Sequence, residues 1–189
     1  RQQVEFIRPA GFSLASAAQP KSRGGLRNKT ERPNVTISAD YLRTLPLTER
    51  DRQIVRYLSE VGYATTAQLY HLFFHDLANP EKEAQRRLLK LWSWHVLDRM
   101  PGTGLEKYGI WSQLVYSPGK AGLFMLDEED PEGGKWRKRR GTALMSHNVL
   151  LSGYLVDLAA TADRIGWTYS FHGERTASVE YQQDGRWLR

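Results

Sequence analysis

Residues 79–97, NPEKEAQRRLLKLWSWHVL, carry the pattern that decides the fold. Asn79-Pro80 is a typical helix start, because proline fits the first turn of a helix without losing a hydrogen bond. At about 100° per residue, the apolar side chains then fall within about 60° of one line: Ala84, Leu88, Leu91, Trp92 and His95. The opposite side is basic and polar, with Arg86 and Lys90 at its front, Lys82 and Ser93 beside them, and Gln85 and Arg87 on its flanks. The pattern predicts a helix with an apolar back and a basic front.

Two shorter helices are predicted before it. Thr48 is a good N-cap, and Gly62 is a good stop for a helix whose apolar face includes Ile54 and Leu58. Thr65 and Gln68 have the spacing of a capping box, so a second helix is expected to begin there and to end near His75.

A two-stranded hairpin is predicted after residue 96. Residues 109–117 are rich in β-branched and aromatic side chains, and residues 97–100 are expected to pair with them. Residues 120–126 are expected to form a short helix. Three helices followed by a hairpin is the layout of a winged helix-turn-helix. The expected fold class is mainly α with small β: a winged helix-turn-helix domain, then a long helix and a short terminal strand pair.

The chain divides into four predicted parts: a basic flexible arm at 1–46, the winged-helix domain at 47–126, a charged loop at 127–141, and the long helix with terminal strands at 142–189. Residues 1–33 hold seven basic and two acidic side chains. In the loop, five acids at 127–132 precede five basic residues at 135–140. Two interpretations of the loop stay open: it pairs with itself, or its basic half contacts phosphates.

The long helix, predicted at 142–165, is apolar on two sides. One stripe is expected to pack on the winged-helix core: Leu144, Leu151, Tyr154, Leu155, Leu158, Ala162 and Ile165. The opposite line is small or β-branched and is predicted to be a dimer interface: Val149, Gly153, Val156 and Ala160. The alternative is that a later part of the same protein covers this line. Strands are predicted at 167–171 and 176–181.

Composition narrows the class of protein. The 189 residues include no cysteine, which excludes disulfides and thiolate metal sites and is compatible with a reducing cytoplasm. The longest run without a charged side chain, 141–156, is shorter than the roughly 20 apolar residues of a membrane span. No secretion signal is recognisable. The net charge of +6 favours an anionic partner, and double-stranded DNA is the expected one.

No catalytic, cofactor or metal site is expected, so the chain is predicted not to be an enzyme. His71 and His75 have the i, i+4 spacing that can hold a metal, but no third ligand is evident, and stacking and capping are the expected roles. A truncated metal-dependent nuclease remains a weaker alternative, resting on Glu174, Glu180 and Asp184 near the end of the chain.

The predicted DNA contacts come from four places. Arg86 and Lys90 are expected to face the major groove, with Gln85 and Arg87 at its edges and Lys82 nearby. Thr65, Thr66 and Gln68 are expected to hold a phosphate at a helix N-terminus. The remaining expected contacts are salt-sensitive ones from the hairpin and the charged loop: Lys107, Lys135, Arg137, Lys138, Arg139 and Arg140.

Several segments, in their order and spacing, also resemble a known family: LTERDRQIV at 47–55, ATTAQL at 64–69, QRRLLKL at 85–91, LDR at 97–99, VYSPGKAG at 115–122 and HNV at 147–149. Over residues 47 to about 160 the chain resembles the replication-relaxation family of bacterial plasmids and integrative mobile elements. The resemblance implies a role in plasmid replication and DNA relaxation, the nicking step before transfer, or in the transcriptional control of these events. The competing hypothesis is a protein-interaction module that docks a relaxase or a replication initiator.

Overall fold

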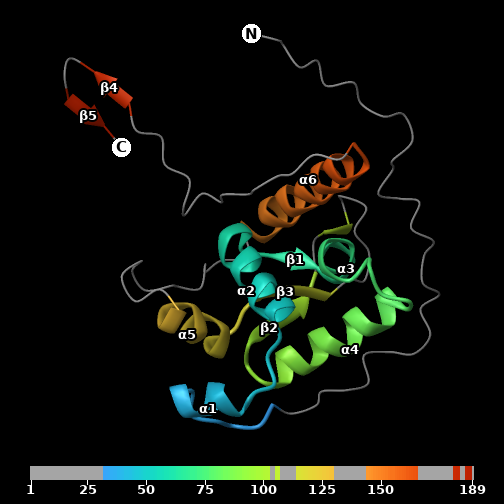
Figure 1. Cartoon of the computed structure of the whole chain (residues 1–189), viewed down its shortest axis with the longest axis vertical. Coiled ribbons are helices and arrows are strands. Elements are labelled where there is room, and N and C mark those ends of the chain that lie inside the picture. The colour runs from blue at the N-terminus through green and yellow to red at the C-terminus, as the bar shows by residue number, and fades with distance from the viewer. Residues whose placement is uncertain are drawn as a thin grey trace.

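The computed structural model describes residues 32–102, 105–106, 114–129 and 144–165, and the backbone of 181–183 and 186–188. It is mainly helical with a small antiparallel sheet, which confirms the predicted fold class. The elements in chain order are α1 (Ala39–Thr44), α2 (Glu49–Val61), β1 (Ala64–Thr65), α3 (Thr66–Phe73), α4 (Pro80–Ser93), β2 (Leu97–Pro101), β3 (Leu114–Pro118), α5 (Lys120–Glu129), α6 (Met145–Arg164), β4 (Tyr181–Gln183) and β5 (Arg186–Leu188). Figure 1 shows α2 and the sheet at the centre, with α4 and α6 on different sides of α3.

The helix boundaries follow the capping signals of the sequence. Thr48 caps α2 in a full capping box with Asp51, and Gly62 ends the helix with a φ of 84°. Thr65 and Gln68 form the second capping box, at the start of α3. Pro80 stands in the first turn of α4, as predicted.

The sheet has the strand order β1-β3-β2 and is antiparallel throughout. Leu97 pairs with Pro118 and Pro101 with Leu114, so β2 and β3 form the expected pair. The two-residue strand β1 pairs Ala64 with Tyr116, and the sequence pattern does not predict it. β1 ties the start of α3 to the sheet.

One continuous core joins the sheet and the first helices. Ile54 and Leu58 of α2 belong to the same buried cluster as Leu88 and Leu91 of α4, and all four are fully buried. Tyr57 on α2 reaches α6, where its hydroxyl lies 2.6 Å from Ser152 Oγ. Burial raises the pKa of Tyr57 to about 12, so it stays a neutral hydrogen-bonding group.

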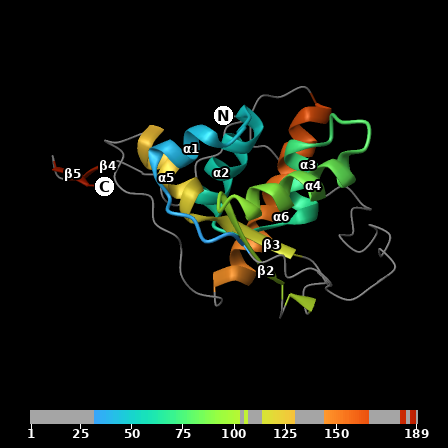
Figure 2. The same cartoon turned by 90° about the horizontal axis from the view of Figure 1, so that it is seen from below.

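The segment before α2 is more ordered than an arm. α1 lies within the predicted arm at 1–46, and Ser38 caps it. The Tyr41 hydroxyl donates to the Trp94 carbonyl oxygen at 3.1 Å, and Figure 2 shows α1 beside α5. Residues 1–31, most of the predicted arm, lie outside the described residues.

The two apolar lines of α6 do not divide between core and outer surface as predicted, although Leu155 of the first line does pack on the core. Val149 and Gly153 are buried, and the Val149 carbonyl accepts a 2.7 Å hydrogen bond from Gln68 on α3. A Cβ added to Gly153 would come within 3.2 Å of Gln68 Nε2. These two residues therefore pack on the body of the molecule, and the prediction that they form a dimer interface was wrong. Val156 is half-buried and Ala160 exposed.

The end of the chain is described only in part. β4 and β5 pair antiparallel, with Tyr181 opposite Leu188. The strand predicted at 167–171, and all of the one predicted at 176–181 except Tyr181, lie outside the described residues. Among the helices that the structure describes, none has the length and apolar character needed to cross a membrane.

Candidate nucleic-acid interface

The outward face of α4 gathers most of the side chains predicted to contact DNA. Ala84, Leu88 and Leu91 are fully buried, which fixes the rotation of the helix. The opposite side chains are all exposed: Lys82, Gln85, Arg86, Leu89 and Lys90. The helix therefore presents a polar, cationic face about 21 Å long on a rigid apolar back.

Local carboxylates hold two of these side chains. Arg86 Nη2 lies 2.6 Å from Glu83 Oε2, and its side chain is 67% exposed. Gln85 Nε2 donates to Glu81 Oε1 at 3.2 Å. Exposed pairs of this kind are worth less than about 1 kcal/mol. Both side chains can therefore leave their partners for a stronger ligand.

Arg87 is not part of this face, so its predicted place at the groove edge was wrong. Arg87 Nε donates to Asp51 Oδ1 at 2.8 Å, and Nη2 donates to Asp51 Oδ2 and to the Pro46 carbonyl. The guanidinium also lies 5.3 Å from the ring centre of Trp94. Because the guanidinium is committed to these partners, Arg87 joins α4 to α2 instead of reaching outward.

Asp51 is the buried partner in that pair, with 1% of its side chain exposed. Burial alone would raise the pKa of its carboxyl, but hydrogen bonds from Arg87 and Thr48 outweigh burial and hold the pKa below its ordinary value. The carboxylate thus completes the α2 capping box and anchors α4 at the same time.

The predicted phosphate site at the start of α3 is also corrected. Thr65 and Gln68 are buried, and each accepts a hydrogen bond from the backbone N–H of the other. Gln68 Nε2 is in addition committed to Val149. Thr66 is half-buried, with its hydroxyl 3.5 Å from the Leu114 carbonyl. The side chains of Thr65 and Gln68 therefore hold α3 against the sheet and α6.

A second cationic cluster lies at the C-terminal end of α4, and the sequence pattern does not predict it. Arg99 on β2 stacks over Trp92, 3.7 Å from the ring centre, and Arg32 approaches the same ring at 5.1 Å. Arg32 also pairs with Asp98 at 2.6 Å and donates to the Trp92 carbonyl at 2.8 Å. Because Arg32 is more than 60 residues away in sequence, no local pattern could reveal this contact. These contacts hold Arg32 beside α4 and β2.

Leu89 is the one apolar side chain of the outward α4 face, and sequence analysis passed over it. It is 43% exposed, and around the helix it lies between Gln85 and Lys82. Arg86 is the next cation on the outward side.

The other predicted contacts lie outside the described residues, so the structure says nothing of their positions: Lys107, Lys135, Arg137, Lys138, Arg139 and Arg140.

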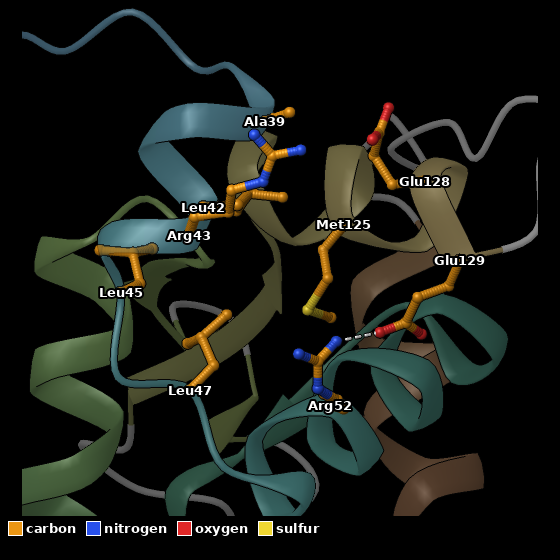
Figure 3. Close-up of a pocket in the computed structure, with 9 residues that line it drawn as sticks. All are labelled: Ala39, Leu42, Arg43, Leu45, Leu47, Arg52, Met125, Glu128 and Glu129. Atoms are coloured by element: carbon orange, nitrogen blue, oxygen red, sulfur yellow. Dashed lines mark hydrogen bonds and ion pairs between the residues drawn. The ribbon is translucent and has the colours of Figure 1, made fainter.

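A cleft of about 230 Å³ opens on a different surface, between α1, α2 and α5. Figure 3 shows Leu42, Leu47 and Met125 along its apolar wall. Arg52 and Glu129 form an ion pair at its edge, and Arg56 joins them with its Nη2 2.8 Å from Glu129 Oε2. Burial would raise the pKa of Glu129, but its hydrogen bonds from Arg56 and Arg52 outweigh burial and lower the pKa.

The histidine pair near the end of α3 is engaged with the backbone. His75 Nδ1 lies 3.0 Å from the carbonyl oxygen of His71, in the expected capping role. Burial lowers the pKa of His71, with nearby Asp157 of α6 opposing this shift. In the described part of the chain no group of three His, Asp or Glu side chains could hold a metal ion.

Comparison with known proteins identifies one family. The family model described as replication-relaxation matches residues 55–188, which is more than two thirds of the chain. The match covers β1 to β5 and the second half of α2. No curated protein and no solved structure matches the chain.

Proposed function

Because the chain belongs to the replication-relaxation family, we propose that it is a double-stranded DNA-binding protein of a bacterial plasmid or mobile element. Membership links it to replication and relaxation. The proposal adds that α2, α3, α4 and the β2–β3 hairpin work as a winged helix-turn-helix in the bacterial cytoplasm. It also adds that the chain serves replication, relaxation or their transcriptional control by binding, not by catalysis.

The observation that carries the proposal is the outward face of α4. Arg86 and Lys90 are exposed on a helix whose other side is locked into the core. An α-helix fits the major groove, where arginine can donate two hydrogen bonds to guanine and lysine can donate to the same acceptors. When Arg86 leaves Glu83 to bind a guanine, the protein loses only a weak surface ion pair.

The cluster on Trp92 supports the same orientation. Arg32 attaches the basic arm next to the C-terminal end of α4, so cationic residues 1–31 join the described part of the chain beside the proposed groove-binding helix. Arg99 adds a cation at the base of the hairpin. Contacts of these groups with phosphates would position the protein on the duplex without reading its sequence.

The test is to select bound sequences from a random duplex pool and then measure affinity for the selected site. The variant Arg86→Ala plus Lys90→Ala is expected to lose at least about tenfold in affinity, since one good base contact is worth about 1–3 kcal/mol. The matched control is Arg43→Ala plus Lys120→Ala, which removes the same charge from exposed positions on α1 and α5. Equal losses in the two variants, or no selected site, would contradict the proposal.

The cleft beside Met125 favours a second candidate function, a module that docks a relaxase or a replication initiator. Its apolar wall and charged edge suit an apolar side chain of a partner protein. In that case DNA affinity is weak, falls steeply with salt and shows no preferred sequence, and Met125→Glu abolishes co-purification with the partner.

We also propose that the protein works as a homodimer, because a symmetric pair of α4 helices would read two half-sites of one duplex. The predicted interface residues Val149 and Gly153 are buried against α3 and cannot serve. The dimer therefore needs another surface.

A further inference from the structure

The outward side of α6 is the largest concentration of exposed apolar side chains in the described part of the chain. The described part of the chain has six exposed large apolar side chains, and one of them is Leu89 on α4. The other five lie on α6 or at its two ends: Leu144, Leu150, Tyr154, Leu158 and Ile165. Tyr154, in the middle of the helix, is 57% exposed. Single exposed apolar side chains are common, but five along one helix mark an interaction surface.

Four of these five side chains, all except Leu150, fall on a heptad repeat, which here defines the α6 seam. Its seven positions are separated by three and four residues in turn: Leu144, His147, Leu151, Tyr154, Leu158, Thr161 and Ile165. Every seventh position is Leu or Ile. A spacing of 3.5 residues keeps one seam facing a second helix over three heptads, whereas packing on a domain core needs no such regularity. The seam therefore fits another helix.

The core-facing side of α6 already packs against the rest of the molecule. Met145, Val149 and Ser152 are buried against the body of the molecule, and Ser152 is tied to Tyr57. Leu144, Tyr154 and Leu158 point away from these contacts, roughly on the other side of the helix. The seam is thus a second apolar surface of α6, separate from the one that packs on the core.

The charge of the seam decides between possible occupants. None of its seven positions is Asp, Glu, Lys or Arg, and the charged residues of α6, Asp157, Asp163 and Arg164, lie off the seam. An uncharged seam offers nothing to a phosphate or an acidic peptide. It also has no charge pattern that would select a different helix, and none that would repel an identical one.

We propose that the α6 seam of a second copy of this chain covers the α6 seam of the first, so that the two helices form a two-stranded coiled coil. The seam runs over residues 144–165, about 33 Å of helix, which provides the three heptads that such pairing needs. Figure 1 shows α6 and α4 on different sides of α3, so pairing through α6 leaves the outward face of α4 free in both copies. The proposed pairing of the two helices does not depend on DNA. Only the idea that the dimer reads two half-sites rests on the proposed function.

The absence of cysteine makes a direct test possible, since an introduced thiol can form a disulfide only with the same residue of another copy. In the full chain without DNA, mild oxidation of Leu158→Cys and of Tyr154→Cys is expected to give covalent dimers. Ala160→Cys is the matched control, because Ala160 is exposed on the opposite side of α6. It is expected to cross-link several-fold less.

Sedimentation of the unmodified chain gives the second readout. The measured mass is expected to be that of two chains. In the variant Tyr154→Glu plus Leu158→Glu it should fall to the mass of one chain, while the helical circular dichroism spectrum stays unchanged and shows that the variant is folded. A single-chain mass for the unmodified protein would overturn the proposal and would mean that another segment of the chain, or another protein, covers the seam. Equal cross-linking at positions 158 and 160 would overturn it too. DNA affinity is measured separately with the α4 variants, so failure of the dimer and failure of DNA binding are distinguishable.

Discussion

Arg87 and Arg86 are neighbours on the same helix and have opposite roles. Arg87 is bound by buried Asp51 and a backbone carbonyl, whereas Arg86 is exposed and holds only Glu83. Sequence periodicity places both correctly on α4. It cannot show that Asp51, 36 residues earlier, accepts a hydrogen bond from Arg87. The partner of a flanking cation is a tertiary property, and this is why the predicted role of Arg87 was wrong.

Arg87→Ala is expected to lower the free energy of unfolding by about 3 kcal/mol, because it leaves the Asp51 carboxylate buried without its partner. Urea denaturation measures this loss, and Arg86→Ala is the matched control with an expected loss under about 1 kcal/mol. A loss for Arg87→Ala no larger than that of the control would contradict the structural role.

The same pair predicts a dependence on acid. The pKa of Asp51 is lower in the folded chain than in the unfolded chain, so ionisation of its carboxyl stabilises the fold. That contribution is fully present above the ordinary Asp pKa of about 3.9 and is lost as the pH falls through the lower folded value. Below about pH 4 the free energy of unfolding should therefore fall less steeply with pH in Asp51→Asn than in the unmodified chain. The same slope in both proteins would contradict this role of Asp51.

Leu89 supplies a prediction about sequence preference. An apolar side chain among cations on the proposed groove-binding helix suits the 5-methyl group of thymine. Replacing the contacted thymine of the selected site by deoxyuridine should weaken binding about fourfold, the worth of one buried methyl group at about 0.8 kcal/mol. In Leu89→Ala the same replacement should have no effect. If no thymine of the site shows this difference between the two proteins, Leu89 is not a methyl contact.

At the scale of elements, α5 is held by close backbone approach. Gly119 donates its N–H to the Val96 carbonyl at 2.9 Å, and a Cβ on Gly122 would stand 2.4 Å from the same oxygen. His95, with φ of 59°, makes the turn from α4 to β2 that receives α5. The helix therefore docks on the exit of α4.

Gly122→Ala is expected to destabilise the fold by about 1–3 kcal/mol, because α5 must move away from Val96 and Val55. Lys120→Ala, on the exposed side of the same helix, is the control and should leave the denaturation midpoint unchanged. An equally small effect of both changes would show that α5 tolerates displacement.

The elements that could be predicted are those with local signals. The caps at Thr48, Gly62 and Thr65 and the proline of α4 mark helix ends through contacts within a few residues. α1 and β1 were missed because they are stabilised by distant partners, Trp94 and Tyr116. The two apolar lines of α6 were recognised but their partners were not, because periodicity does not say which residues meet Gln68.

The predicted DNA-contacting residues divide in the same way. Lys82, Gln85, Arg86 and Lys90 lie on the exposed face, because the buried side of one helix dictates its outward side. Thr65 and Gln68 followed a sound capping signal, yet the strand β1 buries that helix start in the sheet. The contacts of a helix end cannot be inferred from its cap alone.

At the scale of the whole molecule, the surfaces separate by chemistry. The exposed cations of α4 lie on one side of α3, and α6 with its uncharged seam lies on another, as Figure 1 shows. This separation lets one molecule meet an anionic duplex and an apolar partner at the same time.

The central claim is that the outward face of α4 lies against the bases of a duplex. The most direct measurement attaches an iron chelate to Gln85→Cys in the otherwise cysteine-free chain and maps where the bound duplex is cleaved. Strong cleavage confined to the selected site is expected, with little from the same chelate on Arg43→Cys of α1. Cleavage from α1 with none from α4 would contradict it.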